Sequence, residues 1–385
     1  MHFRAARSFW PESSLLAANR SLPAQPSGDS YESRRKALAA YLANRKLDAA
    51  LIAFGPNLRY LTGFTGDNGV LLAGSGYAVF FTDPRFRLQA AQEVDCRTKI
   101  AKGPLLPDVV AEVRRQRIRR LGFEPARTPY ATYEFLKSHL PLKVSLEGLP
   151  GWLEERRMVK SADEIARVRQ AVNTNSKAFQ QGIQRVRAGV REQDLAAELE
   201  YRMRRLGAEK AAFETIVAGG ERSALPHARP TKAALANHSL VVIDMGAFVD
   251  GYASDMTRML HVGRPSERVR RLYRAVLEAQ LAAITAARAG VTAAHVDAAA
   301  RRVLRAEKLD HAFVHSTGHG LGLEIHEPPR LGKKVSTRLE PGMTVTIEPG
   351  VYLEGFGGIR IEDTVLITRT GCEVLTPTSK ELIVI

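Results

Sequence analysis

Apolar residues recur with two different periods along the first part of the chain. Residues 33–46 place Leu38, Tyr41 and Leu42 at helical spacing, whereas residues 49–54 form a short apolar run typical of a buried strand. The sequence Gly-Pro-Asn at 55–57 predicts a turn. The further elements predicted here are strands at 69–73 and 77–82 and helices at 109–116 and 133–140. This alternation predicts an α/β domain over residues 31–155.

The second part, residues 156–385, contains the same series of predicted elements twice, namely two helices followed by strands. Ser161 and Glu164 form a capping-box signature, which predicts a long helix that continues to about residue 187. Two helices and then strands follow each other in each half, so we expect two related halves. The remaining predicted elements are helices at 192–206, 264–289 and 292–308 and strands at 215–218, 239–249, 343–352, 358–368 and 381–385.

The first 30 residues follow neither pattern and predict a flexible N-terminal extension. Serine, proline and alanine dominate it, and Arg4, Arg7 and Arg20 are also compatible with an organellar targeting peptide. No run of about 18 apolar residues predicts a membrane-spanning helix. The two cysteines, Cys96 and Cys372, are far apart, which argues against a disulfide framework and favours a cytoplasmic location.

The composition is basic but otherwise ordinary for a globular protein. The 385 residues include 56 Lys and Arg against 41 Asp and Glu, a net charge of +15. Such an excess can indicate a nucleic-acid partner. The charge is spread widely, however, and no aromatic residues alternate with it to form a base-stacking surface. A charged, solvated surface is the favoured interpretation, and a basic nucleic-acid- or protein-binding module stays an alternative.

Acidic residues and histidines gather in the second part of the chain. Asp244 ends an apolar run, Asp255 follows eleven positions later, and a turn at Gly251 would bring the two carboxylates together. The other candidates are three histidines and two glutamates, namely His315, His319, His326, Glu348 and Glu362.

This set of residues predicts a metal site. Glu348 and Glu362 lie in strand-like apolar sequence, where an unpaired carboxylate is costly to bury. Carboxylates that meet in one core repel each other unless cations lie among them. Oxygen donors with an imidazole suit Mn²⁺, Co²⁺ or Zn²⁺. Gly318 and Gly320 argue against a helical zinc-binding pair, so we expect His315 to be structural; His238, His261 and His311 are expected to be solvated.

The segments that carry these residues resemble those of the pita-bread metallopeptidases. The matching segments are 240–258, 317–328, 347–352 and 358–363. Residues 35–64, which end in Asn-Leu-Arg-Tyr-Leu-Thr-Gly-Phe, resemble the creatinase-like N-terminal domain of aminopeptidase P and prolidase. The resemblance implies a creatinase-like α/β domain followed by a pita-bread α+β catalytic domain with two related αα-β halves.

The resemblance also implies a ligand set for two divalent ions, with manganese favoured and cobalt or zinc possible. Asp244 would chelate one ion, and Asp255 and Glu362 would bridge the two. His319 and Glu348 would hold the second ion.

Catalytic roles follow from the same resemblance. Glu348 would carry a proton to the leaving nitrogen, and His227 and His326 would bind the substrate and stabilise the oxyanion. The alternative that His227 is a loop histidine after proline without such a role stays open. Arg360 would position its strand or the carboxylate side of the substrate. Some relatives carry a polar aromatic residue before the last glutamate, whereas residues 353–358 offer only Phe356.

The expected activity is that of a metallo-exopeptidase that cleaves between an N-terminal residue and proline. The resemblance implies a homodimer, and its peptide substrate carries proline at the second position; dipeptide and longer substrates stay equally open. A lyase or hydrolase of a small metabolite on the same fold is a further alternative.

Overall fold

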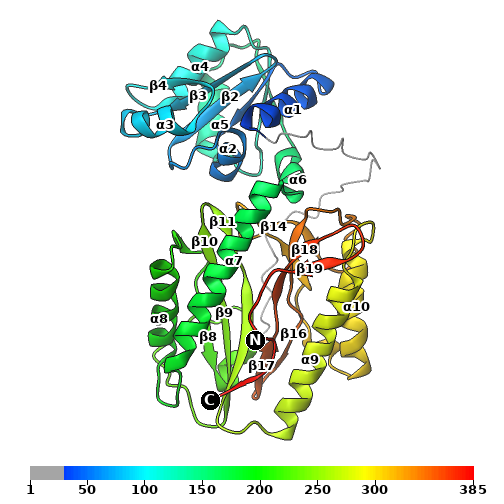
Figure 1. Ribbon diagram of the computed structural model, residues 1–385. Helices are drawn as coiled ribbons and strands as arrows, with labels where there is room; N and C mark the ends of the chain where they lie inside the picture. The colour runs from blue at the N-terminus through cyan, green and yellow to red at the C-terminus, as the bar shows by residue number, and fades with distance from the viewer. Residues whose placement is uncertain (1–29) are drawn as a thin grey trace, which may run out of the picture.

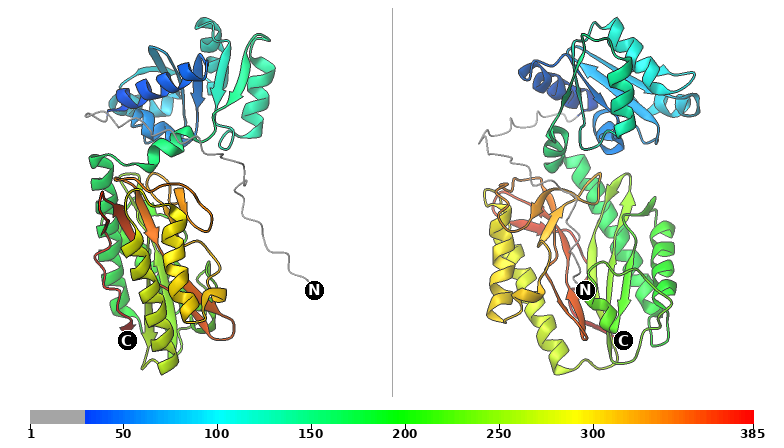
Figure 2. Two further views of the ribbon diagram at one scale, coloured as in Figure 1. Left: turned by 90° about the vertical axis from the view of Figure 1, so that its right-hand side faces the viewer. Right: turned by 180° about the vertical axis from the view of Figure 1, so that it is seen from behind.

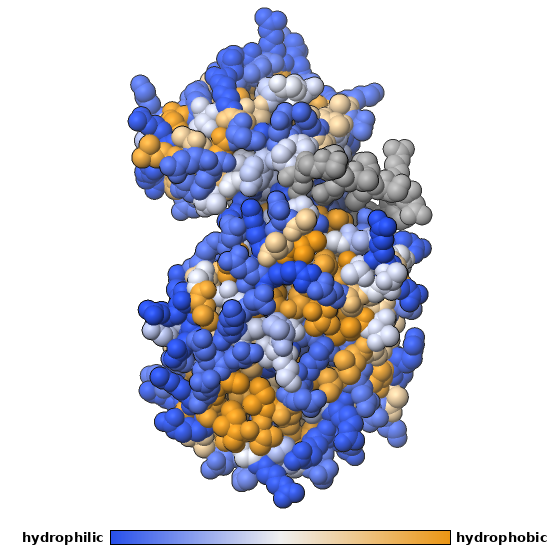
Figure 3. Space-filling model, in the orientation of Figure 1, coloured by the Kyte–Doolittle hydropathy of each residue, from blue (hydrophilic) through white to orange (hydrophobic). Residues whose placement is uncertain are grey.

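Residues 30–385 are described by the computed structural model, and they form two lobes joined at a narrow waist (Figures 1 and 3). The extension predicted for residues 1–30 therefore lies outside the described residues except for Ser30. The face shown in Figure 3 is largely hydrophilic on the N-terminal lobe, while apolar residues gather on the larger lobe. None of the helices within residues 30–385 combines the length and the apolar character that a membrane crossing requires.

The N-terminal lobe is a mixed six-stranded sheet in the order β4-β3-β2-β1-β5-β6. Its strands are β1 (Ala49–Ile52), β2 (Gly69–Gly74), β3 (Tyr77–Thr82), β4 (Arg97–Ile100), β5 (Arg120–Phe123) and β6 (Ser145–Gly148). Its helices are α1 (Tyr31–Asn44), α2 (Gly55–Thr62), α3 (Arg87–Glu93), α4 (Leu105–Arg115) and α5 (Tyr130–His139), with a short 3₁₀ turn η1 (Pro84–Phe86).

Both faces of this sheet are buried. In β1, Ala50 and Ile52 pack toward α1 and α2, whereas Ala49 and Leu51 pack toward α4 and α5. Because successive side chains of a strand point to opposite faces, a strand covered on both sides is apolar throughout. The unbroken apolar run at 49–52 is explained in this way, and the predicted α/β architecture is confirmed.

The turn predicted at 55–57 is wrong, because these residues begin α2. Pro56 stands in the first turn of the helix, where its missing N–H would have no helical partner in any case. Gly63, with φ of 80°, ends the helix in the left-handed conformation. The glycine–proline signal therefore marks a helix start in this chain.

The larger lobe consists of two helical layers with strands between them (Figures 1 and 2). Helices α7 (Ala162–Gly182) and α8 (Glu192–Arg205) lie on one side, and α9 (Glu267–Ala286) and α10 (Ala293–Ala306) lie on the other. Short 3₁₀ turns are η2 (Ile183–Arg185), η3 (Gly220–Ala224) and η4 (Asp310–Ala312). This order of two helices and then strands, given twice, confirms the predicted pair of related halves.

The strands of this lobe form two main sheets and two small ones. The first sheet has the order β20-β12-β9-β8 and the second β14-β13-β15-β18-β19; the small ones are β11-β10-β7 and β16-β17. The strands are β7 (Lys210–Ala211), β8 (Ile216–Gly219), β9 (Ser239–Met245), β10 (Ala247–Val249), β11 (Tyr252–Ala253), β12 (Met256–Val262), β13 (Gly318–Gly320), β14 (Glu327–Leu331), β15 (Thr344–Ile347), β16 (Gly350–Leu353), β17 (Gly357–Arg360), β18 (Asp363–Ile367), β19 (Cys372–Val374) and β20 (Ile383–Val384).

Three long strands predicted from the sequence are interrupted in the structure. The strand at 239–249 breaks at Gly246, the one at 343–352 breaks at Glu348 and Pro349, and the one at 358–368 breaks at Ile361 and Glu362. Two of the breaks coincide with candidate metal ligands. The chain leaves the regular ladder where these glutamates turn inward.

The two lobes share an apolar core. Leu58 and Leu61 of α2 belong to the same buried cluster as Phe248 and Tyr252 of the larger lobe and Leu321. Helix α6 (Trp152–Met158) connects the lobes and packs against both α2 and β14. The boundary predicted between residues 155 and 156 falls within this helix and stays an interpretation.

We predict that Ser161→Ala destabilises the larger lobe. The Ser161 hydroxyl accepts from the Glu164 N–H, and the Glu164 carboxylate accepts from the Ser161 N–H, which confirms the predicted capping box of α7. Its loss should lower the free energy of unfolding by about 1 kcal/mol in urea titrations followed by circular dichroism. Ser138→Ala is the matched control, because the exposed Ser138 hydroxyl caps no helix N-terminus and, among the described residues, makes contacts only within α5, to two carbonyls and to His139 Nδ1. Equal effects of the two substitutions would contradict the prediction.

Candidate metal centre

The β9–β12 ladder brings the two aspartates together. Asp244 pairs with Thr257 across this antiparallel ladder, so Asp255, two residues earlier, enters the same space. Between them, β10 and β11 form a tight hairpin in which Asp250 and Gly251 both have positive φ. Positive φ at both central residues is the geometry of a tight two-residue hairpin turn, so the turn expected at Gly251 is confirmed.

His319 lies on β13 between Gly318 and Gly320, two positions at which the neighbouring backbone leaves no room for a side chain. A Cβ on Gly318 would lie 1.9 Å from the Thr346 carbonyl oxygen of β15, and one on Gly320 would lie 2.3 Å from the Pro328 carbonyl oxygen. Any larger residue would push the strands apart. The expectation that this segment is not helical is confirmed.

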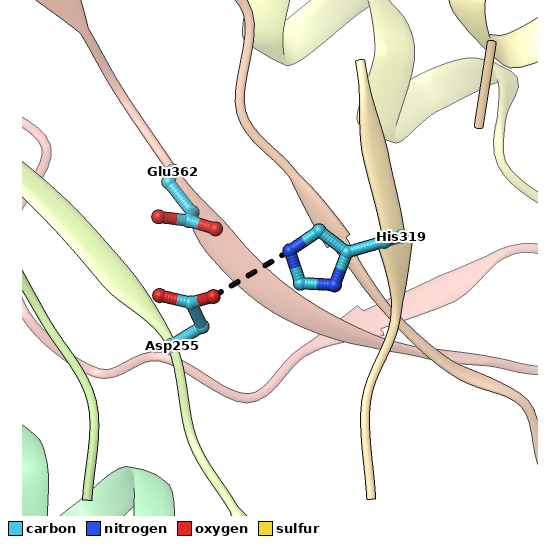
Figure 4. Close-up of side chains that lie close together, drawn as sticks. All are labelled: Asp255, His319 and Glu362. Atoms are coloured by element: carbon cyan, nitrogen blue, oxygen red, sulfur yellow. Dashed lines mark ion pairs between the residues drawn. The ribbon is translucent and has the colours of Figure 1, made fainter. Parts of the chain in front are cut away.

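Three side chains from different strands and connections point toward one another (Figure 4). One ligand atom each of Asp255, His319 and Glu362 lies within 4.8 Å of the others. His319 Nε2 is 3.6 Å from Asp255 Oδ2 and 3.5 Å from Glu348 Oε1. Asp244 adjoins the group, because Asp244, Glu348 and Glu362 all act electrostatically on Asp255.

Burial and mutual repulsion dominate the electrostatics of this cluster. Burial, followed by the charges of neighbouring carboxylates, raises the pKa values of Asp255 and Glu362 well above their usual range. Burial raises the pKa of Glu348 to about 7. Burial and then the nearby His326 lower the pKa of His319 to about 3, so this imidazole is neutral. The protein thus places a neutral donor among carboxylates that need positive charge.

Two oxygen atoms of the cluster are left without partners. Asp244 Oδ1 and Asp255 Oδ1 are buried and have no hydrogen-bond partner among the described residues. Buried carboxylate oxygens are normally hydrogen-bonded or coordinated to a metal. The unpaired oxygens, with a neutral imidazole beside them, fit hard or borderline divalent ions.

Arg360 organises one side of the site from the end of β17. Its Nη2 donates to Asp244 Oδ2 at 2.7 Å, and its Nε donates to the Thr257 hydroxyl at 3.0 Å. Its Nη1 donates to the Pro226 carbonyl and to the Tyr352 hydroxyl. The guanidinium is therefore held entirely by the protein.

Tyr352 is a site residue that the sequence analysis missed. Its hydroxyl lies 2.7 Å from Arg360 Nη1 and 2.8 Å from His315 Nε2. A polar aromatic residue was expected only within 353–358, one position beyond Tyr352. Its place directly after Glu-Pro-Gly-Val, in β16 beside β17, is the signal that could have identified it.

The remaining histidines lie close to one another. The His326 ring lies 4.4 Å from the His319 ring, and partial burial, followed by the charge of His227, lowers the pKa of His326. His227 also acts electrostatically on His315, whose Nε2 lies 2.8 Å from the Tyr352 hydroxyl. The structural role expected for His315 stays a prediction.

His261 was expected to be solvated, and that prediction is wrong. It is 2% exposed, and its Nδ1 lies 2.8 Å from the Gly263 carbonyl oxygen. It stands in the apolar strand β12, where every residue is buried. His238 and His311 are exposed, as predicted.

Comparisons with known proteins agree with this architecture. Residues 166–369 match the model of metallopeptidase family M24, and residues 34–159 match that of the creatinase/prolidase N-terminal domain. The Xaa-Pro dipeptidase of Pyrococcus horikoshii is 36% identical over 92% of this chain and 100% of its own length.

Solved structures give the same result. A structure of the Xaa-Pro dipeptidase from Bacillus anthracis matches with a TM-score of 0.90 and 36% identity, over 92% of this chain and 100% of that one. The X-Pro aminopeptidase from Thermotoga maritima matches with a TM-score of 0.85 and 36% identity, over 91% and 100%. The chain belongs to metallopeptidase family M24 and carries the creatinase/prolidase N-terminal domain.

Proposed function

We propose that the protein is an Xaa-Pro exopeptidase that binds two divalent metal ions. The observation that carries the proposal is the convergence of buried Asp255, His319 and Glu362, with unpaired carboxylate oxygens beside them. Asp244 and Glu348 complete the proposed ligand set. Asp255 and Glu362 would bridge the ions, Asp244 would hold one of them, and His319 and Glu348 would hold the other.

The proposed chemistry divides between the ions and this chain. When bound, the ions would supply a water molecule whose pKa is lowered toward neutrality. Glu348 would accept the proton that the attacking water loses and pass it to the leaving imide nitrogen of proline. The His326 ring lies 4.4 Å from the His319 ring, and His227 acts electrostatically on His326, so both histidines would donate hydrogen bonds to the developing oxyanion.

Arg360 has the role of positioning Asp244 in this proposal. Of the two roles expected for it, the geometry supports the structural one, because its guanidinium donates to Asp244, Thr257, Pro226 and Tyr352. The charge-assisted bond from Nη2 holds Asp244 Oδ2 in place. Asp244 would therefore present its unpaired oxygen in one direction.

The substrate length stays open between two relatives of equal identity. A dipeptidase and an aminopeptidase each match this chain at 36% identity. Both act on Xaa-Pro bonds according to their names, and together with the donor set they support a peptidase over a lyase or a basic binding module. Manganese as the ion, a homodimer and a cytoplasmic location belong to the same proposal. Free Cys96 and Cys372 accord with that location.

A substrate panel tests the proposed function. We predict that the purified protein with Mn²⁺ releases alanine from Ala-Pro or from Ala-Pro-Ala, whereas Ala-Ala is not cleaved. Parallel reactions with Co²⁺, Zn²⁺ and a chelator identify the metal requirement. Failure to cleave both proline peptides with all three metals would contradict the proposal, and so would chelator-resistant cleavage.

We predict that metal affinity falls as the pH falls from 8 to 5. Without metal, burial raises the pKa of Glu348 to about 7 and raises those of Asp255 and Glu362, so acidification protonates the site. A cation must displace these protons, and each proton displaced weakens binding by about tenfold per pH unit. His319, with a pKa of about 3, adds nothing in this range. Calorimetric titration with Mn²⁺ should show proton release; affinity that is constant over this range would contradict the assignment.

We predict that Gly318→Ala weakens metal binding. The added Cβ would meet the Thr346 carbonyl oxygen and displace His319 from the carboxylates. Metal affinity should fall roughly 10–100-fold, the range found when groups that orient a ligand are changed. Gly371→Ala is the control, because a Cβ there meets nothing within 4 Å. The idea fails if the two variants bind Mn²⁺ equally well.

A further inference from the structure

A second cluster of buried charges lies at the waist between the lobes and ends at the loop that carries His326. None of its members has a role in the chemistry described above. They come from the N-terminal lobe, the connecting helix α6 with the residues after it, and the larger lobe: Asn57, Glu124, Arg157, Lys160, Glu324 and Glu327.

Arg157 stands at the centre of this cluster. It lies in α6 with its side chain 2% exposed, and its Nη2 donates to Glu324 Oε2 at 2.9 Å and pairs with Glu327. Burial alone would raise the pKa of Glu327, but the charges of Arg157 and Lys160 lower it to about 2. The Glu327 carboxylate therefore stays charged and is held from two sides.

Asn57 fastens Arg157 to the N-terminal lobe. Its Oδ1 accepts from Arg157 Nη1 at 2.7 Å, and its Nδ2 donates to Glu124 Oε1 at 2.7 Å. Glu124 Oε2 in turn accepts from the N–H groups of Ala53 and Phe54, where β1 leads into α2. Fully buried, Asn57 thus joins the backbone of one lobe to the charge cluster of the waist.

Glu327 fixes the loop on the other side. It directly follows His326, and its Oε1 accepts from the Glu324 N–H at 3.0 Å. A Cβ on Gly322 would lie 3.0 Å from both Glu327 Oε2 and Lys160 Cε, so the loop is folded closely around this carboxylate. His326 directly precedes the anchored Glu327, and its ring lies 4.4 Å from the ring of His319.

We propose that Arg157 is a positioning residue that couples the placement of the N-terminal lobe to the orientation of His326. The inference rests on the proposed role of His326 in substrate binding. Net stability is a poor explanation for the cluster, because taking ion pairs out of water costs about as much as their attraction returns. The fork of Arg157 instead holds Asn57, Glu324 and Glu327 in one fixed geometry.

Arg157→Lys tests the proposal by keeping the charge and removing the fork. One ammonium group cannot reach all three partners, so kcat/KM for the proline peptide should fall roughly 10–100-fold, the loss expected for a small misplacement of a substrate-binding group. Arg59→Lys is the matched control. Arg59 Nη2 pairs with Asp250 Oδ1 at 2.9 Å across the same waist. Its partner lies in the β10–β11 turn and not in the loop that carries His326. It should leave kcat/KM unchanged.

Two further measurements separate positioning from a general loss of structure. In a His326→Ala background, Arg157→Lys should cause no additional loss of kcat/KM, because the group through which it acts is gone. A full additional loss would overturn the proposal. Glu324→Gln weakens one contact of Arg157 and should lower kcat/KM by a smaller factor. This variant replaces Arg157→Lys in the test if Arg157→Lys does not fold.

A readout without catalysis distinguishes this proposal from the proposed function. In metal-free protein labelled with ¹⁵N-histidine, the ring signal of His326 is identified by its loss in His326→Ala. It should shift or broaden in Arg157→Lys and remain unchanged in Arg59→Lys. An unchanged His326 signal in Arg157→Lys would overturn the coupling. A shifted signal in a protein that shows no peptidase activity would support the coupling and reject the proposed function.

Discussion

Carboxylates that share a buried space repel one another, and the larger lobe is built around the need for compensating positive charge. Neighbouring carboxylates raise the pKa values of Asp255 and Glu362. The guanidinium of Arg360, which donates to Asp244, lowers them in part. A single cation cannot balance several buried carboxylates. Divalent ions at the unpaired oxygens would supply the missing charge. The chemistry proposed for the protein therefore begins as a solution to an electrostatic problem.

The two halves of the lobe supply different parts of that solution. The first half gives Asp244 and Asp255 through the β9–β12 ladder, and the second gives His319 from β13. The halves meet where the Glu362 N–H donates to the Thr257 carbonyl and the Thr364 hydroxyl donates to the Asp255 carbonyl. These hydrogen bonds join the two halves and so fix the relative positions of the candidate ligands that each half supplies. A fixed arrangement of polar groups favours catalysis.

Local signals in the sequence were enough for most of the elements and for the candidate group of acidic residues and histidines. The capping box at Ser161 and the glycines around His319 depend on neighbours a few residues away, so both were predicted correctly. The buried state of His261 and the contact between Tyr352 and His315 depend on strands that are distant in sequence. A single sequence holds no local trace of such tertiary contacts, which is why these residues were misjudged or missed.

The helix α2 and the waist cluster show the same limit at a larger scale. Gly-Pro-Asn reads equally well as a turn or as a helix start, and packing of Leu58 and Leu61 into the shared core decides for the helix. Arg157 looked like any other basic residue of a basic chain. Only the assembled waist shows that this arginine neutralises two carboxylates.

Part of the arginine content of the chain forms ion pairs inside the protein. Arg157 and Arg258 are almost completely buried, and Arg258 pairs with Asp363 at 2.7 Å, so both charges are compensated in the interior. At the surface, Arg115 pairs with Glu112, and Arg202 pairs with Glu198 within α8. Charges that are locally paired contribute little to a field that could attract a polyanion. The pairs thus weaken the local field of individual arginines, whereas the buried cluster of Asp255, His319 and Glu362 is the feature that favours an enzyme over a basic binding module.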